Sequence, residues 1–249
     1  MSSLTTAELA IYAVLVLPTL FVLFKHGKPG LIGWGFLFVF CSLRVIGGAL
    51  FLTDSSAAVT VSNIGLSPLL ICTAGLLHEA QYYREKPSRA EKVKIVLFHL
   101  LVGAGVALMI VGLSGVQSKS PTPDDQKKVK IGLGILTASW GFLVLQAIRA
   151  AFEKGYSSRD NVFITRLLIA VAIGLVFVGI RVIYTLVALT SNDADLNPIT
   201  GTLAVRVVLS FLPELIAVLV HLVAGLLTRD IRALSEREDK TRDSLDSVA

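Results

Sequence analysis

Long apolar stretches alternate with short polar interruptions along the chain as far as residue 228. The interruptions carry glycine, proline or charged residues, which end a helix or turn the chain. A run of about 20 apolar residues is long enough to cross the hydrocarbon core of a bilayer as a helix. The pattern therefore predicts seven membrane-spanning helices, at residues 8–24, 31–53, 59–83, 95–113, 129–152, 161–190 and 203–228.

These spans leave room only for short loops and a tail. We therefore predict an all-α seven-transmembrane-helix bundle in one domain, residues 1–228, followed by a polar tail at residues 229–249. Gly27 and Pro29 forbid continuation of the first helix. Pro68, near the middle of the third span, predicts a kink or local unwinding, and Pro213 is expected to free a carbonyl oxygen one turn back in the seventh.

The composition excludes a water-soluble globule. Of the 249 residues, 54% are hydrophobic and 16% are charged, whereas an average soluble domain is about 25% charged. The net charge of +5 would suggest nucleic acid as the partner of a soluble chain. Here the basic residues lie in short loops beside apolar spans, so we expect membrane lipids and no nucleic acid as partners. The sequence indicates no particular protein partner.

Basic residues are distributed unequally between the two sides of the predicted bundle. Fifteen lie on the side of the C-terminus: Lys25, Lys28, Arg84, Lys86, Arg89, Lys92, Lys94, Arg149, Lys154, Arg159, Arg229, Arg232, Arg237, Lys240 and Arg242. Four lie on the side of the N-terminus: Lys119, Lys127, Lys128 and Lys130. Because cytoplasmic loops are enriched in Lys and Arg, we predict a cytoplasmic C-terminus and an N-terminus on the outer or lumenal side. This prediction covers the plasma membrane and internal membranes alike.

Three charged residues lie close to the centres of predicted spans: Arg44, Arg181 and Glu214. A charge at the bilayer centre costs about 2.5–3.5 kcal/mol on insertion scales, so such residues are expected to face one another inside the bundle. Counting from the span ends at about 1.5 Å per residue places all three in one layer, slightly to the outer side of the bilayer midplane. Ser67 in the third span reaches a similar level.

This layer is a candidate ligand-binding site. Two arginines against one carboxylate leave one positive charge, which an anionic or carbonyl-bearing ligand would complete. We predict ligand-binding roles for Arg44, Arg181, Glu214, Ser67 and His221. His221 lies about two turns from Glu214 on the same helix face, either as a satisfied core histidine or as a proton relay. The structural alternative is a buried ion pair that only fixes helix packing.

No other group of residues predicts a metal or cofactor site. His78, Glu79 and His99 are expected near one membrane interface, but their spacing matches no metal-ligand pattern. Cys41 and Cys72 lie inside apolar spans, so no disulfide is expected. The seventh span contains no lysine, which excludes a retinal Schiff base of the opsin type.

Short motifs in several spans resemble those of a known family. They are His26-Gly27, Phe40-Cys41-Ser42-Leu43-Arg44-Val45-Ile46-Gly47-Gly48, Gly65-Leu66-Ser67-Pro68-Leu69-Leu70, Gly75-Leu76-Leu77, Arg181-Val182-Ile183-Tyr184, Leu212-Pro213-Glu214 and Ala224-Gly225-Leu226. The set is similar to the pattern of a fungal family of seven-helix integral membrane proteins catalogued only as a domain of unknown function. The resemblance extends from the first span to the seventh, and it implies the fold but no activity.

Three functions are compatible with these features. The leading hypothesis is a receptor-like or carrier-like protein that binds a small lipophilic molecule with an anionic or carbonyl group. The alternative is a membrane-embedded isomerase or cyclase acting on a lipid or terpenoid, with Glu214 as general acid and His221 as its relay. The third is a structural membrane protein that needs only the buried ion pair.

Overall fold

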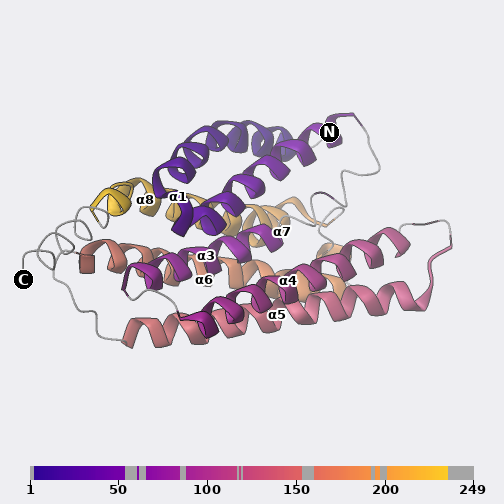
Figure 1. Cartoon of the computed structure of the whole chain (residues 1–249). Helices are drawn as coiled ribbons and strands as arrows, with labels where there is room; N and C mark the ends of the chain where they lie inside the picture. Colours follow the sequence, from indigo (N-terminus) through magenta and orange to yellow (C-terminus); the bar gives the residue numbers. More distant parts are fainter. Residues whose placement is uncertain are drawn as a thin grey trace, which may run out of the picture.

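Helices make up all the regular secondary structure in the described part of the computed structural model (Figure 1). The structure describes residues 3–53, 61, 66–84, 88–116, 118, 120–152, 160–191, 194–196 and 201–234. The elements are α1 (Ser3–Leu52), α3 (Leu66–Arg84), α4 (Arg89–Val116), α5 (Pro123–Phe152), α6 (Asp160–Thr190), the 3-10 turn η1 (Ala194–Leu196), α7 (Leu203–Arg206), the π-helix η2 (Val207–Phe211) and α8 (Leu212–Leu227). The all-α prediction is confirmed, because none of the described residues forms a strand.

The element α1 is a hairpin of two helical arms. Gly27 has backbone angles φ 63° and ψ −148°, which glycine adopts without the steric cost of a Cβ atom. Pro29 follows the break, where a helix needs no donor from its first backbone nitrogens. The arms lie side by side, since the Tyr12 and Phe40 ring centroids are 5.6 Å apart. The predicted end of the first span at this turn is confirmed.

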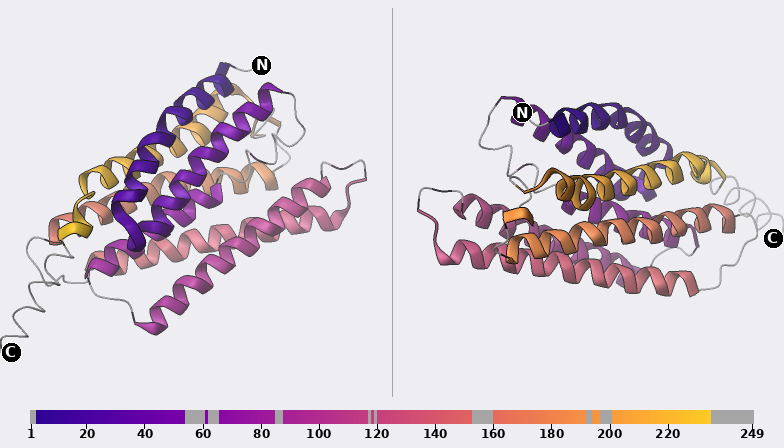
Figure 2. Two further views of the ribbon diagram at one scale, coloured as in Figure 1. Left: turned by 45° about the horizontal axis from the view of Figure 1, so that its top comes forward. Right: turned by 180° about the vertical axis from the view of Figure 1, so that it is seen from behind.

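Neighbouring helices pack in a chain of contacts across the molecule. The hairpin α1 packs on α3, α3 on α6, α6 on both α5 and α8, and α5 on α4. The α4–α5 pair forms one side of the molecule and the α1 hairpin the opposite side, with α3, α6 and α8 between them (Figures 1 and 2). The largest fully buried side chains, Trp34, Tyr12 and Phe40, all come from α1. The hairpin therefore contributes the bulkiest buried side chains of the described core.

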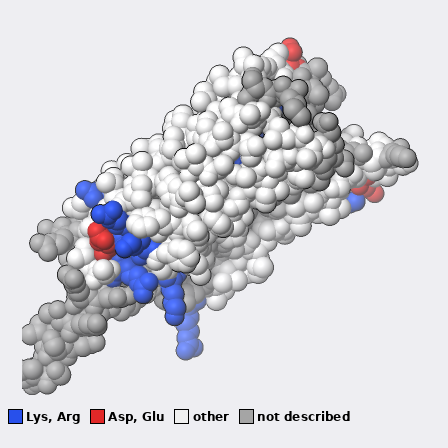
Figure 3. Space-filling view, turned by 90° about the horizontal axis from the view of Figure 1, so that it is seen from above, with Lys and Arg blue, Asp and Glu red and all other residues white. Residues whose placement is uncertain are grey.

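The lateral surface of the bundle is apolar. Leu17, Leu100 and Ile169 are among the large hydrophobic side chains that face outward, with exposed fractions of 71%, 64% and 53%. On the face shown in Figure 3, Lys and Arg side chains gather mainly at one end of the molecule, and most of the remaining surface that is not grey carries no charge. Such a surface is unfavourable in water and suits lipid.

In the described part of the chain, five helical segments are long and apolar enough to cross a membrane: Leu4–Leu52, Val93–Val116, Pro123–Phe152, Val162–Thr190 and Leu203–Leu234. They are consistent with an integral multi-pass membrane protein. Their number differs from the predicted seven for two reasons. Both arms of α1 fall within one of these segments, and α3 is not among them because its second half carries His78, Glu79 and Arg84.

The structure corrects several boundaries. Pro68 lies in the first turn of α3, where the missing N–H is tolerated, so it does not kink the middle of a described helix. The helix α5 begins at Pro123, inside the segment expected to be a loop up to residue 128. Ile231, assigned to the polar tail, is buried at 2% exposure. The first part of the predicted third span (59–65, except Val61), the polar turn at 153–159 and the tail from 235 onward lie outside the described residues.

Candidate functional site

Arg44, Arg181 and Glu214 converge between α1, α6 and α8. The Nε atom of Arg181 donates to Oε1 of Glu214 at 2.7 Å, and Nη2 of Arg44 donates to Oε2. Glu214 is 1% exposed and Arg181 is 3% exposed. The predicted meeting of these three residues in one layer is confirmed, because one carboxylate bonds both guanidinium groups. We call them the arginine–glutamate cluster.

An irregular turn before α8 positions Glu214. The π-helix η2 ends at Phe211, and Pro213 lies in the first turn of α8. Proline lacks an N–H, and its ring would collide with a carbonyl group one turn back, so a wider turn relieves both problems. The disturbance expected from Pro213 therefore takes the form of a π-helix, an element that often accompanies functional sites.

Two half-buried charged residues extend the cluster. The carboxylate of Glu8 in α1 interacts electrostatically with Arg206 in α7 and with all three members of the cluster. The predicted balance of two arginines against one carboxylate is therefore incomplete. Counting Glu8 and Arg206, three guanidinium groups face two carboxylates, so the net excess of one positive charge remains when all five are ionised.

Arg181 has partners on several sides. Besides its bond to Glu214, its Nη1 donates to the hydroxyl of Thr185, one turn further along α6. Its Cζ atom also lies 5.5 Å from the ring centroid of Tyr184. Thr185 is itself buried, at 4% exposure. This arrangement holds the guanidinium in one orientation, so Arg181 acts as a support for Glu214.

Two buried donors beside the cluster have no hydrogen-bond partner among the described residues. One is Nε of Arg44, whose guanidinium also lies over Phe40 with Cζ 5.3 Å from the ring centroid. The other is the hydroxyl of Tyr12, which interacts electrostatically with Arg44 and Glu214. An unsatisfied buried donor costs about 1–3 kcal/mol. An acceptor group on a bound molecule would remove this cost for both donors.

The structure places the other two predicted ligand-binding residues away from these bonds. Ser67 is buried in the first turn of α3, and its predicted role stays a prediction. His221 is fully buried against Gly174 of α6, but neither of its ring nitrogens has a hydrogen-bond partner in the described part of the chain. It is therefore a buried core histidine, but the expectation that its ring would be satisfied by hydrogen bonds is wrong. A direct hydrogen bond to Glu214, which a relay would use, is not formed.

A second buried polar cluster, which the sequence reasoning missed, joins α1, α3 and α8. Its members are His26, Trp34 and Glu79, all 0% exposed. Nδ1 of His26 lies 2.7 Å from Oε1 of Glu79, and Trp34 Nε1 donates to Oε2 at 2.7 Å. Nε2 of His26 lies 3.0 Å from the carbonyl oxygen of Gly225. We call this set the histidine–glutamate cluster.

In the histidine–glutamate cluster, every polar side-chain atom has a hydrogen-bond partner. His26 and Glu79 share one proton. Because a carbonyl oxygen only accepts, Nε2 of His26 must carry a hydrogen. The remaining proton lies between Nδ1 and Glu79, so the pair is either imidazolium and carboxylate or two neutral groups. In both forms the net charge is zero. This explains how two ionisable side chains can be buried completely.

The sequence contained signals for the histidine–glutamate cluster, but Glu79 was assigned to a different group of residues. Glu79 was grouped with His78 and His99 at a membrane interface, whereas the structure turns Glu79 toward His26 and places the two histidines around a separate cavity. A helix periodicity of about 100° per residue already puts adjacent residues on different faces. Gly33 and Gly75, which let α1 and α3 approach closely in the structure, were the other available signal. Among the described residues, no group of three or more His, Cys, Asp and Glu could hold a metal ion.

Comparisons with known proteins give a family and no activity. A family described as a domain of unknown function (DUF7702) matches residues 2–231, nearly the whole chain, so the chain belongs to this family. No curated protein and no solved structure matches the chain. The family resemblance inferred from the motifs is thus confirmed at the level of an uncharacterised domain, and its fungal origin stays a prediction.

Proposed function

We propose that this member of the DUF7702 family is a seven-span membrane protein that binds a small lipophilic molecule with an anionic or carbonyl group. The polar end of that molecule would accept hydrogen bonds from Arg44 and Tyr12. Its apolar part would lie among the helices or in the surrounding lipid. The observation that supports this proposal best is the pair of unsatisfied buried donors beside a cluster with excess positive charge.

The count of seven spans rests on the geometry of α1 and α3. A straight helix of 50 residues would be about 75 Å long, more than twice the roughly 30 Å of a bilayer core. The break at Gly27 gives two arms that each match one crossing. The helix α3 has 19 residues and packs between the hairpin and α6, so surrounding helices shield its polar second half.

The orientation rests on the two ends of the bundle. Hydrogen bonds join Arg84 of α3 to the carbonyl oxygen of Ala150 and Arg166 of α6 to that of Leu227, so these helix ends lie together at the basic end. We place this end in the cytoplasm. A reporter fused to the C-terminus should then be cytoplasmic and one fused to the N-terminus should not. Finding both reporters on the same side would remove one span from the count.

A purely structural role is the competing function. Both oxygens of Glu214 are occupied by arginines, which is what a helix-pinning ion pair requires. The same occupancy weighs against catalysis by Glu214, because a general acid must carry a proton to donate. The unsatisfied donors of Arg44 and Tyr12 favour ligand binding over a purely structural role.

Tyr12→Phe provides the sharpest test. The phenylalanine ring keeps the packing against Phe40 and Phe211 and removes only the unpaired hydroxyl. Protein extracted in mild detergent would be analysed by mass spectrometry for bound small molecules, with Tyr184→Phe as the matched control because that hydroxyl bonds the carbonyl oxygen of Leu196. We expect a co-purifying molecule that is depleted only in Tyr12→Phe. Identical small-molecule content in wild type and both variants would contradict the proposal.

A further inference from the structure

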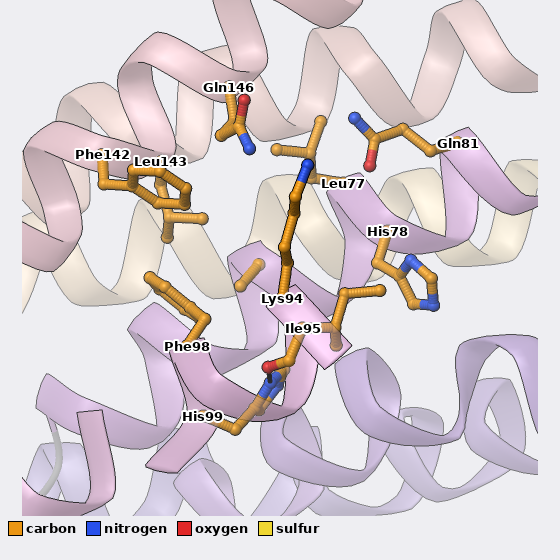
Figure 4. A pocket seen from close by; sticks show the side chains of 11 residues that line it. Leu77, His78, Gln81, Lys94, Ile95, Phe98, His99, Phe142, Leu143 and Gln146 are labelled. Carbon is orange, nitrogen blue, oxygen red and sulfur yellow. Dashed lines mark hydrogen bonds between the residues drawn. The ribbon is translucent and has the colours of Figure 1, made fainter. Parts of the chain in front are cut away.

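A separate cavity of about 70 Å³ lies between α3, α4 and α5. Its polar lining consists of His78, Gln81, Lys94, His99 and Gln146. Figure 4 shows Lys94 reaching between Gln81 and Gln146, with Phe98 and Phe142 together on one side. The two phenylalanine rings stack, with centroids 5.9 Å apart. The cavity therefore has a polar side and an aromatic side, and it shares no residue with either buried cluster.

The polar lining of this cavity suits an anion. Its described residues contribute the lysine ammonium group, two histidines and two amides, and none of them is a carboxylate. Nδ1 of His99 is 2.6 Å from the carbonyl oxygen of Ile95, which fixes the hydrogen on that nitrogen, while the buried Nε2 has no partner among the described residues. With its hydrogen on Nδ1, the neutral ring offers Nε2 as an acceptor.

The cavity lies at the basic end of the bundle, next to a lipid-facing surface. The hydrogen bond from Arg84 to the carbonyl oxygen of Ala150 places the ends of α3 and α5 together there, and Lys94 lies near the start of α4. On the same turns of α4, Val93, Val96 and Leu97 are 57–59% exposed. A molecule with its charged end in the cavity would thus have apolar helix surface directly beside it.

We propose that this cavity binds the phosphate headgroup of an anionic phospholipid from the leaflet at the basic end of the bundle. Its volume supports a headgroup and not a whole ligand, because pockets that enclose drug-sized molecules measure about 300–1,000 Å³. The acyl chains lie outside, along α4. Lys94 supplies the ionic contact, and the amide of Gln146 supplies a further donor.

Binding can be measured on the full chain in detergent by native mass spectrometry. The probes are dioctanoyl phosphatidic acid, dioctanoylglycerol with the same chains and no phosphate, and inorganic phosphate. Phosphatidic acid should bind and the other two should not at the same concentration. Lys94→Gln should weaken phosphatidic acid binding about tenfold or more, the usual effect of losing a charged hydrogen bond.

Lys28→Gln is the matched control, since it removes the same charge from an exposed residue at the same end of the bundle. Gln146→Leu tests the lining without changing charge and should also weaken binding. Tyr12→Phe should bind phosphatidic acid normally, which separates this site from the one proposed beside Arg44. Three outcomes would overturn the proposal: equal binding of the diacylglycerol, binding of inorganic phosphate as tight as that of the lipid, or an equal loss in Lys28→Gln and Lys94→Gln.

Discussion

The two buried polar clusters differ in how completely their groups are paired. In the histidine–glutamate cluster, both nitrogens of His26 and both oxygens of Glu79 have partners, and every side chain is 0% exposed. In the arginine–glutamate cluster, Nε of Arg44 is unpaired and the side chain of Arg44 is 9% exposed. A completed network rigidifies the helices that it joins, whereas an incomplete one leaves groups for a ligand. The comparison is consistent with a scaffold role for the first cluster and with the binding role proposed for the second.

The largest effect is expected from Glu79→Leu. Leucine is similar in size but neither donates nor accepts, so Nδ1 of His26 and Nε1 of Trp34 both lose their buried partner. Each buried polar group left unsatisfied costs about 1–3 kcal/mol. Thermal unfolding in detergent should show a large fall in Tm, and Asp124→Asn at a carboxylate that is 75% exposed should leave Tm nearly unchanged. Equal Tm values for both variants would refute the scaffold role.

Glu214→Gln should destabilise the protein less than Glu79→Leu. It leaves Arg44 and Arg181 without their shared carboxylate, but the nearby carboxylate of Glu8 still balances part of the charge. We expect a loss of stability that a total lipid extract relieves, because an anionic ligand can replace the missing charge. The measurement is Tm with and without extract. A loss as large as that of Glu79→Leu, unrelieved by extract, would leave only the structural role.

Gly75→Ala tests how α3 comes close enough to α1 to place Glu79 beside His26. A Cβ atom on Gly75 would overlap the backbone of Gly33, so the helices must separate. Overpacking of this kind typically costs about 1–3 kcal/mol. Gly134→Ala in α5 is the matched control, because a Cβ there meets nothing within 4 Å. A Tm for Gly75→Ala at or above that of Gly134→Ala would show that this contact does not hold the scaffold.

Tyr12→Phe should have the smallest effect on stability, and it tests most directly whether the two clusters differ in hydrogen-bond pairing. Removing an unpaired hydroxyl leaves no partner unsatisfied, so Tm in ligand-free detergent should stay the same or rise slightly. Trp34→Phe in the completed network should instead lower Tm, because Glu79 loses a donor. If Tyr12→Phe destabilises the protein as much as Trp34→Phe does, the hydroxyl has a structural partner and the two clusters do not differ.

The sequence predicted the helices, the break at Gly27 and the meeting of Arg44, Arg181 and Glu214. Each of these follows from an energetic constraint that acts within a few residues or depends only on depth in the membrane. Apolar runs form helices that need lipid, glycine before proline ends a helix, and charges at one depth must find each other. The helix irregularity near Pro213 could also be predicted, because a missing N–H affects only the adjacent helical turn.

Tertiary structure decided which polar groups are paired. His26 lies 53 positions from Glu79 and 199 from Gly225, and no periodicity of one helix relates these positions. Their contact depends on how the hairpin angle at Gly27 and the Gly33–Gly75 approach orient three helices at once. The unpaired state of Tyr12 and Nε of Arg44 has the same origin. A hydrogen bond requires a partner within about 3 Å and in the right direction. The sequence gives the depth of a residue along its span, whereas the position and rotation of each helix in the bundle decide whether two groups at one depth meet.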